Sequence, residues 1–294
     1  MPGRNRYSHF GTEVCEYDLS ISRIKAMVIA ALAVINVFFL TFIIRDTVAD
    51  ARSGRKAIEN ACAVLRSNGI AVDPDAIKSA GAIRAMRTAR GDASETAIAR
   101  AFLGAANMTD QGVIYLYENT ERGTAEFYSG GDFEILIIEG VITNTGGTLR
   151  TVNRLLRSMQ LKTKEPTITG APGNETVTAV CTYKGASIFN CAVEFVFREN
   201  SLERVTGRYV TGIEAAEDGS EISTAGTTLL CFLAAVRRGE IECARIYGVE
   251  AGYQYSVAGP SGGVITPAWL ITADSGQYII DDATGEIRQL TIDN

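Results

Sequence analysis

The sequence contains almost no histidine. His9 is the one histidine among 294 residues, and it lies close to the N-terminus. A Ser-His-Asp triad, a Cys-His dyad and a histidine-rich metal site all need imidazole groups inside the folded domain. Because His9 lies in a short N-terminal tail, such sites are excluded from the rest of the chain.

An excess of basic charge is also missing. The chain has 28 Lys and Arg residues against 34 Asp and Glu residues, which gives a formal net charge of −6. A nucleic-acid-binding protein usually carries a basic stripe that neutralises phosphate groups. We therefore predict no nucleic-acid partner. Hydrophobic residues make up 46% of the chain, which is typical of a protein with a packed core.

The six cysteines lack the C-x-x-C spacing of a zinc or redox site. Cys181 and Cys191 flank an expected hairpin turn at residues 184–186, where a cross-strand disulfide is geometrically possible. Alternatively, both are free thiols that pack as small hydrophobic side chains. The sequence leaves both alternatives open.

Motifs that resemble nucleophilic sites lack their companions. The pairs Ser22/Lys25 and Ser53/Lys56 have the S-x-x-K spacing of some acyl transferases, but no second motif accompanies either pair. Ser261 lies in a glycine-rich segment between two expected strands, whereas a serine elbow needs a strand-to-helix turn. We interpret the two pairs as charges flanking an apolar segment and the third segment as a loop.

Three carboxylates gather near the C-terminus, at Asp281, Asp282 and Glu286. They lack the ligand spacing of a calcium loop. Gly285 lies between Asp282 and Glu286, just before a β-rich run, and a tight hairpin turn favours glycine at such a position. We predict a structural turn here, and no catalytic, cofactor-binding or metal-binding residue anywhere in the chain.

One long hydrophobic run is present. Nineteen residues, 26–44, contain no charge, and Asn36 is the one strongly polar residue among them. As a helix they would extend about 28 Å, enough to cross a bilayer core. Ala49-Asp50-Ala51 fits a signal-peptidase site, but the run exceeds the usual apolar region of a signal peptide. We predict an uncleaved transmembrane anchor, in which Asn36 is either tolerated or hydrogen-bonded to a partner helix.

The anchor divides the chain into predicted parts. Residues 1–22 form a cytoplasmic tail, 23–45 the anchor, and 46–143 and 144–294 two parts of an extracytoplasmic domain. Basic residues are nearly balanced across the anchor, with a slight excess on the N-terminal side from Arg23 and Lys25. We therefore predict a single-pass protein of the cell membrane with its N-terminus in the cytoplasm.

Hydrophobic periodicity beyond the anchor predicts helices followed by groups of strands. We expect helices at residues 50–66, 94–103, 148–161 and 227–238. We expect strands at 70–72, 112–118, 124–128, 133–139, 176–183, 188–197, 202–209, 244–255, 265–273, 278–280 and 287–292. This order predicts an α+β fold with helices packed on antiparallel sheets, in which the helix-then-strands unit recurs. Trp269, the one tryptophan, is expected in the core of a strand or, alternatively, on a partner-facing surface.

Several segments together resemble YycI-type regulatory proteins. The N-terminal segment Ile21–Lys25 enters the anchor, and Lys184–Cys191 has a turn followed by an Ile-Phe strand. The C-terminal third follows the helix, strand, Trp-strand and hairpin order of that family, at residues 238–241, 248–253, 267–272 and 276–285. The likeness extends over two thirds of the chain, and the hairpin also suits a PepSY-like domain.

The resemblance implies a non-enzymatic accessory of an essential sensor histidine kinase that controls cell-wall metabolism. In that family the accessory acts through transmembrane and extracytoplasmic contacts, alongside a YycH-type protein. The chain departs from the pattern in its long N-terminal tail and its several cysteines beyond the anchor. The alternative is a PepSY-like envelope protein that binds or inhibits a peptidase or cell-wall enzyme.

Overall fold

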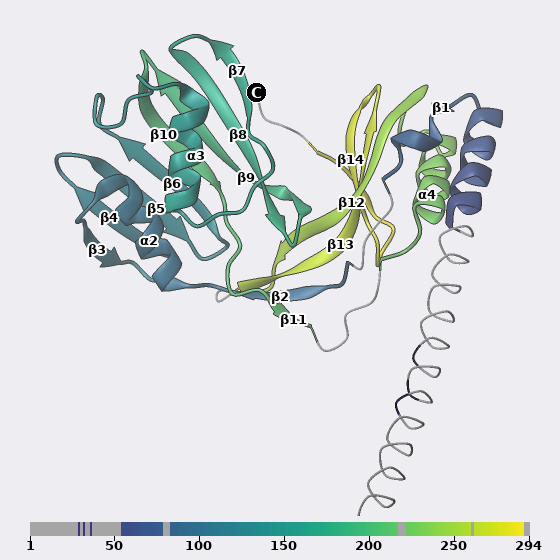
Figure 1. The fold of residues 1–294 in the computed structure, drawn as a ribbon, viewed down its shortest axis with the longest axis horizontal. Coiled ribbons are helices and arrows are strands. Elements are labelled where there is room, and N and C mark those ends of the chain that lie inside the picture. Colours follow the sequence, from purple (N-terminus) through teal and green to yellow (C-terminus); the bar gives the residue numbers. More distant parts are fainter. Residues whose placement is uncertain are drawn as a thin grey trace, which may run out of the picture. The chain divides into compact units, whose positions relative to one another are not determined.

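The computed structural model describes residues 54–78, 83–216, 222–259 and 262–290, together with Ile29, Leu32 and Asn36. The chain divides into two compact units, residues 1–57 and 58–294, and the second unit carries the architecture below. It is an α+β fold with a large, mainly antiparallel sheet, as predicted (Figure 1). The division of the ectodomain at residues 143/144 stays a prediction.

Each helix is followed by a group of strands. The helix of residues 54–67 precedes β1 (Ala71–Val72), the 3-10 helix η1 (Pro74–Ala76) and β2 (Met86–Ala89). The second group consists of α2 (Asp92–Leu103) and the strands β3 (Asn107–Asp110), β4 (Ile114–Asn119), β5 (Gly123–Tyr128) and β6 (Asp132–Ile137). The third consists of α3 (Thr148–Ser158) and the strands β7 (Thr167–Ala171), β8 (Asn174–Tyr183), β9 (Ala186–Arg198) and β10 (Ser201–Arg208). After the short strand β11 (Glu214–Ala215), the fourth consists of α4 (Ala225–Arg237) and the strands β12 (Arg245–Val257), β13 (Gly262–Ala273), β14 (Gly276–Asp281) and β15 (Ile287–Gln289).

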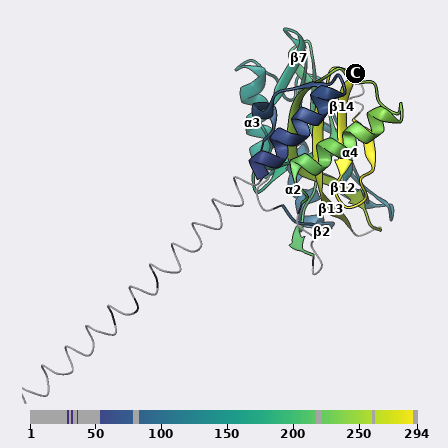
Figure 2. The same ribbon diagram turned by 90° about the vertical axis from the view of Figure 1, so that its right-hand side faces the viewer.

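The strands form two lobes within residues 58–294. The N-terminal lobe contains α2, α3 and the strand order β7-β8-β9-β10-β6-β5-β4-β3. The C-terminal lobe contains α4, residues 58–67 of the preceding helix, and β12 to β15. Helices lie on one face of each sheet; Figure 2 shows α4 and the dark-blue helix in front of β12 and β13.

Strand β9 belongs to both lobes. It pairs with β8 from its first residues onward and with β10 through its later ones, and Ile188 also pairs in parallel with Tyr253 of β12. The Asn190 side chain extends this pairing, because its Nδ2 donates to the Tyr255 carbonyl and its Oδ1 accepts from the Tyr255 amide, both at 2.8 Å. The Asn190 side chain thereby pairs with both backbone groups of Tyr255, as a neighbouring strand would, and links the two lobes.

Each lobe has its own apolar core. In the N-terminal lobe, Val152, Leu155 and Leu156 of α3 are buried against the sheet. In the C-terminal lobe, Trp269 is 1% exposed and packs in a core that also contains Phe232 of α4 and Tyr278 of β14. The prediction that Trp269 is a core residue is confirmed, and the partner-facing alternative is wrong. Within the described residues, its indole nitrogen has no hydrogen-bond partner.

Some predicted boundaries need correction. The segment 166–174, for which no strand was predicted, contains the edge strand β7 and a two-residue turn in which Gly173 has φ +86°. Strands β2 and β3 were not predicted, because neither shows a hydrophobic alternation. Most of the predicted anchor lies outside the described residues. Among those that are described, no helix is long and apolar enough to cross a membrane.

Candidate binding face of the N-terminal lobe

One face of the N-terminal sheet carries no helix within the described part of the chain. Residues of successive strands align in rows across it, about 4.8 Å apart from strand to strand. The row that points to the helices contains Tyr117, Ala125, Ile135, Val205, Phe195 and Val177, all of them at most 4% exposed. Because side chains alternate along a strand, the two flanking rows point to the opposite face. We call this opposite face, formed by these two rows, the open face.

The open face combines acidic and apolar side chains. One row contains Asn107, Glu118, Thr124, Leu136, Arg204, Val196, Thr176 and Thr169. The next contains Thr109, Leu116, Glu126, Glu134, Thr206, Glu194, Thr178 and Thr167. Antiparallel sheets often leave one face to solvent, but that face is usually polar throughout. Apolar residues within it therefore mark a surface that can contact another molecule.

Charged groups on this face are partly paired. Glu134 lies 3.5 Å from Arg204, and in the adjoining row Arg208 donates two hydrogen bonds of 2.8 Å to Asp132. The hydrogen bond with Asp132 raises the pKa of Arg208, so the guanidinium stays charged. Glu118 and Glu194 have no ion pair within the described residues. Two carboxylates are thus available to a cationic group of a partner.

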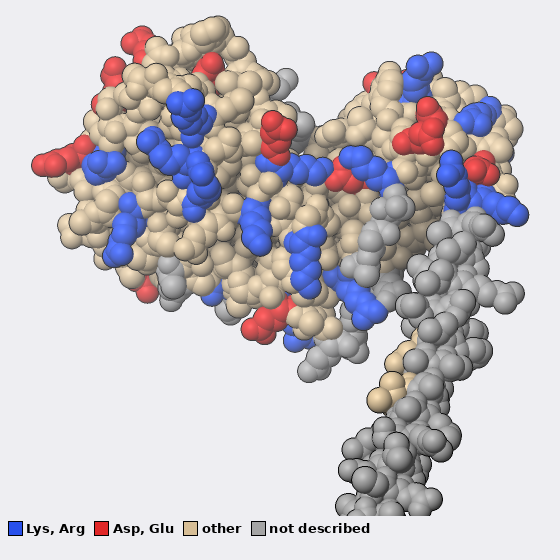
Figure 3. All heavy atoms as spheres, viewed as in Figure 1, with Lys and Arg blue, Asp and Glu red and all other residues tan. Residues whose placement is uncertain are grey.

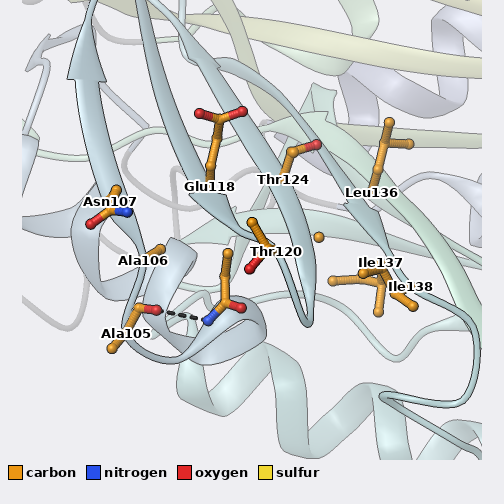
Figure 4. Close-up of a pocket in the computed structure, with 11 residues that line it drawn as sticks. Ala105, Ala106, Asn107, Glu118, Thr120, Thr124, Leu136, Ile137 and Ile138 are labelled. Atoms are coloured by element: carbon orange, nitrogen blue, oxygen red, sulfur yellow. Dashed lines mark hydrogen bonds between the residues drawn. The ribbon is translucent and has the colours of Figure 1, made fainter.

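A hollow of about 720 Å³ lies at one end of the open face (Figure 4). Its walls come from the segment after α2, the β4–β5 turn and the end of β6. Glu118 is the one ionisable residue in its lining, and Leu136 and Ile138 are apolar side chains exposed by 47% and 45%. General acid–base catalysis usually needs a matched pair of titratable groups, whereas this lining suits binding of a side chain with a basic end and an apolar stem.

The walls of the hollow are held by hydrogen bonds to the end of α2. Asn119 Nδ2 donates to the carbonyls of Leu103 and Ala105 at 2.9 and 2.8 Å, and Arg122 Nε donates to Phe102 at 3.0 Å. The carbonyls of Phe102 and Leu103 belong to the last turn of α2, where no intrahelical partner is available. Gly123 has φ +137°, and a Cβ atom there would lie 1.9 Å from the Leu136 carbonyl. Glycine is therefore required at this wall.

A buried charge cluster fixes α2 to the sheet. Glu95 is fully buried and accepts hydrogen bonds from Arg90 at 2.7 and 3.1 Å and from the Tyr209 hydroxyl. Arg90 also lies 4.1 Å from the centre of the Tyr115 ring. Burial, together with the hydrogen bond to Glu95, raises the pKa of Tyr209 well above its ordinary value. All three groups are paired, so the cluster has a structural role and contributes no reactive group.

The predicted candidates lie away from the hollow. Cys181 and Cys191 are free, buried thiols, which agrees with the second alternative. Burial raises the pKa of Cys181 to about 12 and that of Cys191 well above its ordinary value. Neither thiol is therefore a ready nucleophile.

The structural turn at residues 281–285 is confirmed. The Asp281 carboxylate accepts from the amides of Ala283 and Thr284 at 3.0 and 2.9 Å, and Gly285 has φ +70°. Asp282 accepts hydrogen bonds from the backbone amide and hydroxyl of Ser223, just before α4. Both carboxylates are thus used within the fold.

The serine motifs cannot be placed in the fold. Ser22, Lys25, Ser53 and Ser261 lie outside the described residues. The glycine-rich segment around Ser261 does connect two strands, β12 and β13, as predicted.

The open face was not predicted, although the sequence contains a signal for it. Residues 135–138 are Ile-Leu-Ile-Ile, which breaks the alternation of apolar and polar residues in β6. The break places Leu136 and Ile138 on the side opposite the core residue Ile135. Recognising their neighbours required the strand register, which the sequence does not provide.

Comparisons with known proteins do not assign a family. No family model and no curated protein matches the chain. It is similar to an uncharacterized protein from Eubacterium rectale, with 10% identity, coverage of 72% of this chain and 87% of the other, and a TM-score of 0.47. It is also similar to the YpeB C-terminal domain of Bacillus megaterium, with 11% identity, coverage of 70% and 99%, and a TM-score of 0.33. At these TM-scores the likenesses carry no functional argument.

Proposed function

We propose that the chain is a membrane-anchored, non-enzymatic regulator that binds a sensor histidine kinase through its anchor and the open face of its ectodomain. The observation that carries the proposal is the hollow, whose lining combines the unpaired carboxylate of Glu118 with the exposed side chains of Leu136 and Ile138. The uncharged segment 26–44 and the resemblance to YycI-type proteins support the choice of partner. A YycH-type accessory is a further candidate partner.

The regulator acts by binding two signalling states of the kinase with different affinities, because equal affinities would shift no equilibrium. The open face supplies the ectodomain contact: Glu118 pairs with a basic side chain, and Leu136 covers an apolar one. The anchor supplies the second contact, in which Asn36 hydrogen-bonds to a kinase helix within the membrane. The regulator is thus inserted in the cell membrane, with its ectodomain outside the cytoplasm.

Photocrosslinking of the full-length chain in native membranes tests the ectodomain contact. A photoreactive amino acid at Leu136 should crosslink to a histidine kinase, whereas one at Glu242, an exposed loop residue of the C-terminal lobe, should not. The substitution Glu118→Lys should change kinase output. Equal crosslinking from both positions, or kinase output that is insensitive to Glu118→Lys, would exclude the open face as the regulatory contact.

The anchor is tested separately. We expect replacement of residues 26–44 by an unrelated apolar span of equal length to weaken regulation while the protein remains in the membrane. Unchanged kinase output would rule out a specific contact made by the anchor.

The second candidate is a PepSY-like envelope protein that binds or inhibits a peptidase or cell-wall enzyme. The same features favour it, because an extended peptide segment with a basic residue also suits the hollow. Crosslinking from Leu136 distinguishes the candidates: a peptidase or wall enzyme as the main product would replace the kinase assignment.

A further inference from the structure

A basic stripe runs along α3, on the helical side of the N-terminal lobe. Arg150, Arg154 and Arg157 follow one another at helical spacing on the exposed side of the helix, and Lys162 follows just after it. Figure 3 shows Lys and Arg side chains gathered over this part of the molecule. Because the chain as a whole has a net charge of −6, the stripe is a local reversal of sign that the composition does not reveal.

The charges of the α3 basic stripe are not neutralised within the described residues. The helix contains no Asp or Glu, and none of its three arginines forms an ion pair. Arg157 Nε donates instead to the carbonyl of Asn153, one turn earlier at 3.0 Å. Like charges three and four residues apart disfavour an isolated helix. Three arginines on one side of α3 therefore lower its stability, and a role in binding explains why they are present.

Helix α3, which carries the stripe, is fixed by packing of its inner side and by hydrogen bonds at its N-terminus. Thr151, Val152, Leu155 and Leu156 are buried on the inner side of α3. At the helix start, Asn144 Nδ2 donates to Thr148 Oγ1 at 2.8 Å, and the Thr148 hydroxyl donates to the Glu175 carboxylate. A rigid helix presents its arginines without further loss of backbone freedom on binding.

We propose that the α3 basic stripe is a second docking surface, which binds an acidic helix or extended acidic segment of a partner protein. Arg150 and Arg157 are separated by seven residues, about 10 Å along the helix axis. Carboxylates at matching intervals on a partner can each accept two parallel hydrogen bonds from a guanidinium group. The α3 basic stripe and the open face can each bind a partner, because α3 lies on the opposite face of the sheet.

A membrane surface is a poorer match than an acidic protein segment. Helices that lie on bilayers insert a broad apolar face between the headgroups. The apolar side of α3 is already buried in the core, and Leu149, 39% exposed, is the one large hydrophobic residue that the helix exposes. No aromatic residue occurs in α3.

The test uses the full chain in nanodiscs of neutral phosphatidylcholine, with poly-L-glutamate as the probe. The triple variant Arg150→Gln, Arg154→Gln and Arg157→Gln should bind about tenfold more weakly than the unchanged chain, and raised salt should reduce the difference. The control variant Arg237→Gln, Arg238→Gln and Arg245→Gln removes the same charge from exposed positions in the C-terminal lobe. Its affinity should stay within about twofold.

Equal weakening in both variants, or no binding by the unchanged chain, would overturn the inference. Binding of anionic vesicles or inorganic polyphosphate through the stripe, without binding of poly-L-glutamate, would overturn the assignment to an acidic protein segment. Replacement of the three arginines by lysine controls for folding and charge: this variant should bind more tightly than the glutamine variant but more weakly than the unchanged chain, because lysine keeps the charge without the guanidinium fork. Loss of binding in the lysine variant with unchanged thermal unfolding would assign recognition to the guanidinium geometry.

Discussion

The two lobes use the same elements, two helices on one face of a mainly antiparallel sheet, but treat the second face differently. In the N-terminal lobe, that face presents Glu118, Leu136 and their neighbours in the described structure. In the C-terminal lobe, Ala268 and Ile279 on the corresponding face are buried with Phe189 of β9. The second face of the C-terminal sheet is therefore partly covered by apolar contacts, whereas the N-terminal sheet keeps a face for binding.

The difference between the second faces of the two sheets comes from the path of β9. Strand β9 passes from one sheet to the other and brings Phe189 onto the second face of the C-terminal sheet. In the reverse direction, Tyr253 and Tyr255 of β12 and Ile265 of β13 join the core of the N-terminal lobe. The second face of the N-terminal sheet is mainly polar because no element covers it in the described structure. The few apolar side chains on this face mark its contact surface.

The largest expected effect distinguishes the enclosed sheet from the open face. Trp269→Ala should lower the free energy of unfolding by about 3–5 kcal/mol, because it leaves a cavity in the core. Leu136→Ala, on the open face, should lower it by less than about 0.5 kcal/mol. Urea denaturation of the full chain in mild detergent measures both. Similar losses would show that Leu136 is enclosed, which would contradict the open face.

Alkylation of cysteines sharpens the contrast between core and surface. At pH 8, Cys231, exposed on α4, should react with iodoacetamide about a thousandfold faster than Cys181. The pKa of Cys181 is raised to about 12 by burial, so almost no thiolate forms there. Mass spectrometry of the native protein gives both rates, and addition of urea provides the control, since unfolding should make them similar.

The connection between the lobes is tested at Asn190. Asn190→Ala removes both hydrogen bonds to Tyr255, which should lower the free energy of unfolding by about 2 kcal/mol. Asn153→Ala, on the exposed side of α3, is the matched control and should change it by less than about 0.5 kcal/mol. If both variants unfold at the same urea concentration as the parent, the side-chain bridge contributes nothing to the joint.

The smallest expected effect concerns the ion pair between Lys164 and Glu250. Burial raises the pKa of Glu250, but hydrogen bonds from Lys164 and Ser187 outweigh it, and the resulting pKa is lowered. A lowered pKa in the folded state stabilises the protein above the ordinary glutamate pKa of about 4.3, and this contribution is lost as the pH falls through the folded-state pKa.

Glu250→Gln should therefore lower stability at pH 7 by less than about 1 kcal/mol. Thermal unfolding measured from pH 7 to pH 3 should show that this difference disappears in acid. Glu242→Gln, at an exposed loop position, is the control and should show no such trend. A difference that persists at pH 3 would contradict the role of the charge.

The sequence predicted those parts of the fold that depend on local patterns. The amphipathic spacing of Val152, Leu155 and Leu156 predicted α3, and the alternation in β5 and β8 predicted these strands. Strand β7 was missed because Thr167–Ala171 is an exposed edge without buried residues, so it has no alternation to read.

The candidate site depended on information that is not local. The hollow brings together residues from the segment after α2, from β4, β5 and from the end of β6, and their proximity follows from the register of three strand pairs. The α3 basic stripe was hidden for a different reason. Net charge sums over all faces of a molecule, so the acidic residues of the open face masked three arginines on the helix opposite.

The double membership of β9 limits how this chain can be altered by insertion or deletion. Its first residues pair with β8 and, at Ile188, with β12, whereas its later residues pair with β8 and β10. Because side chains alternate with a period of two, one added residue would turn the following side chains to the wrong face of the next sheet. The hairpin turn at Lys184-Gly185 and the turn at Glu199-Asn200, which border the strand, should accept insertions that the strand itself rejects.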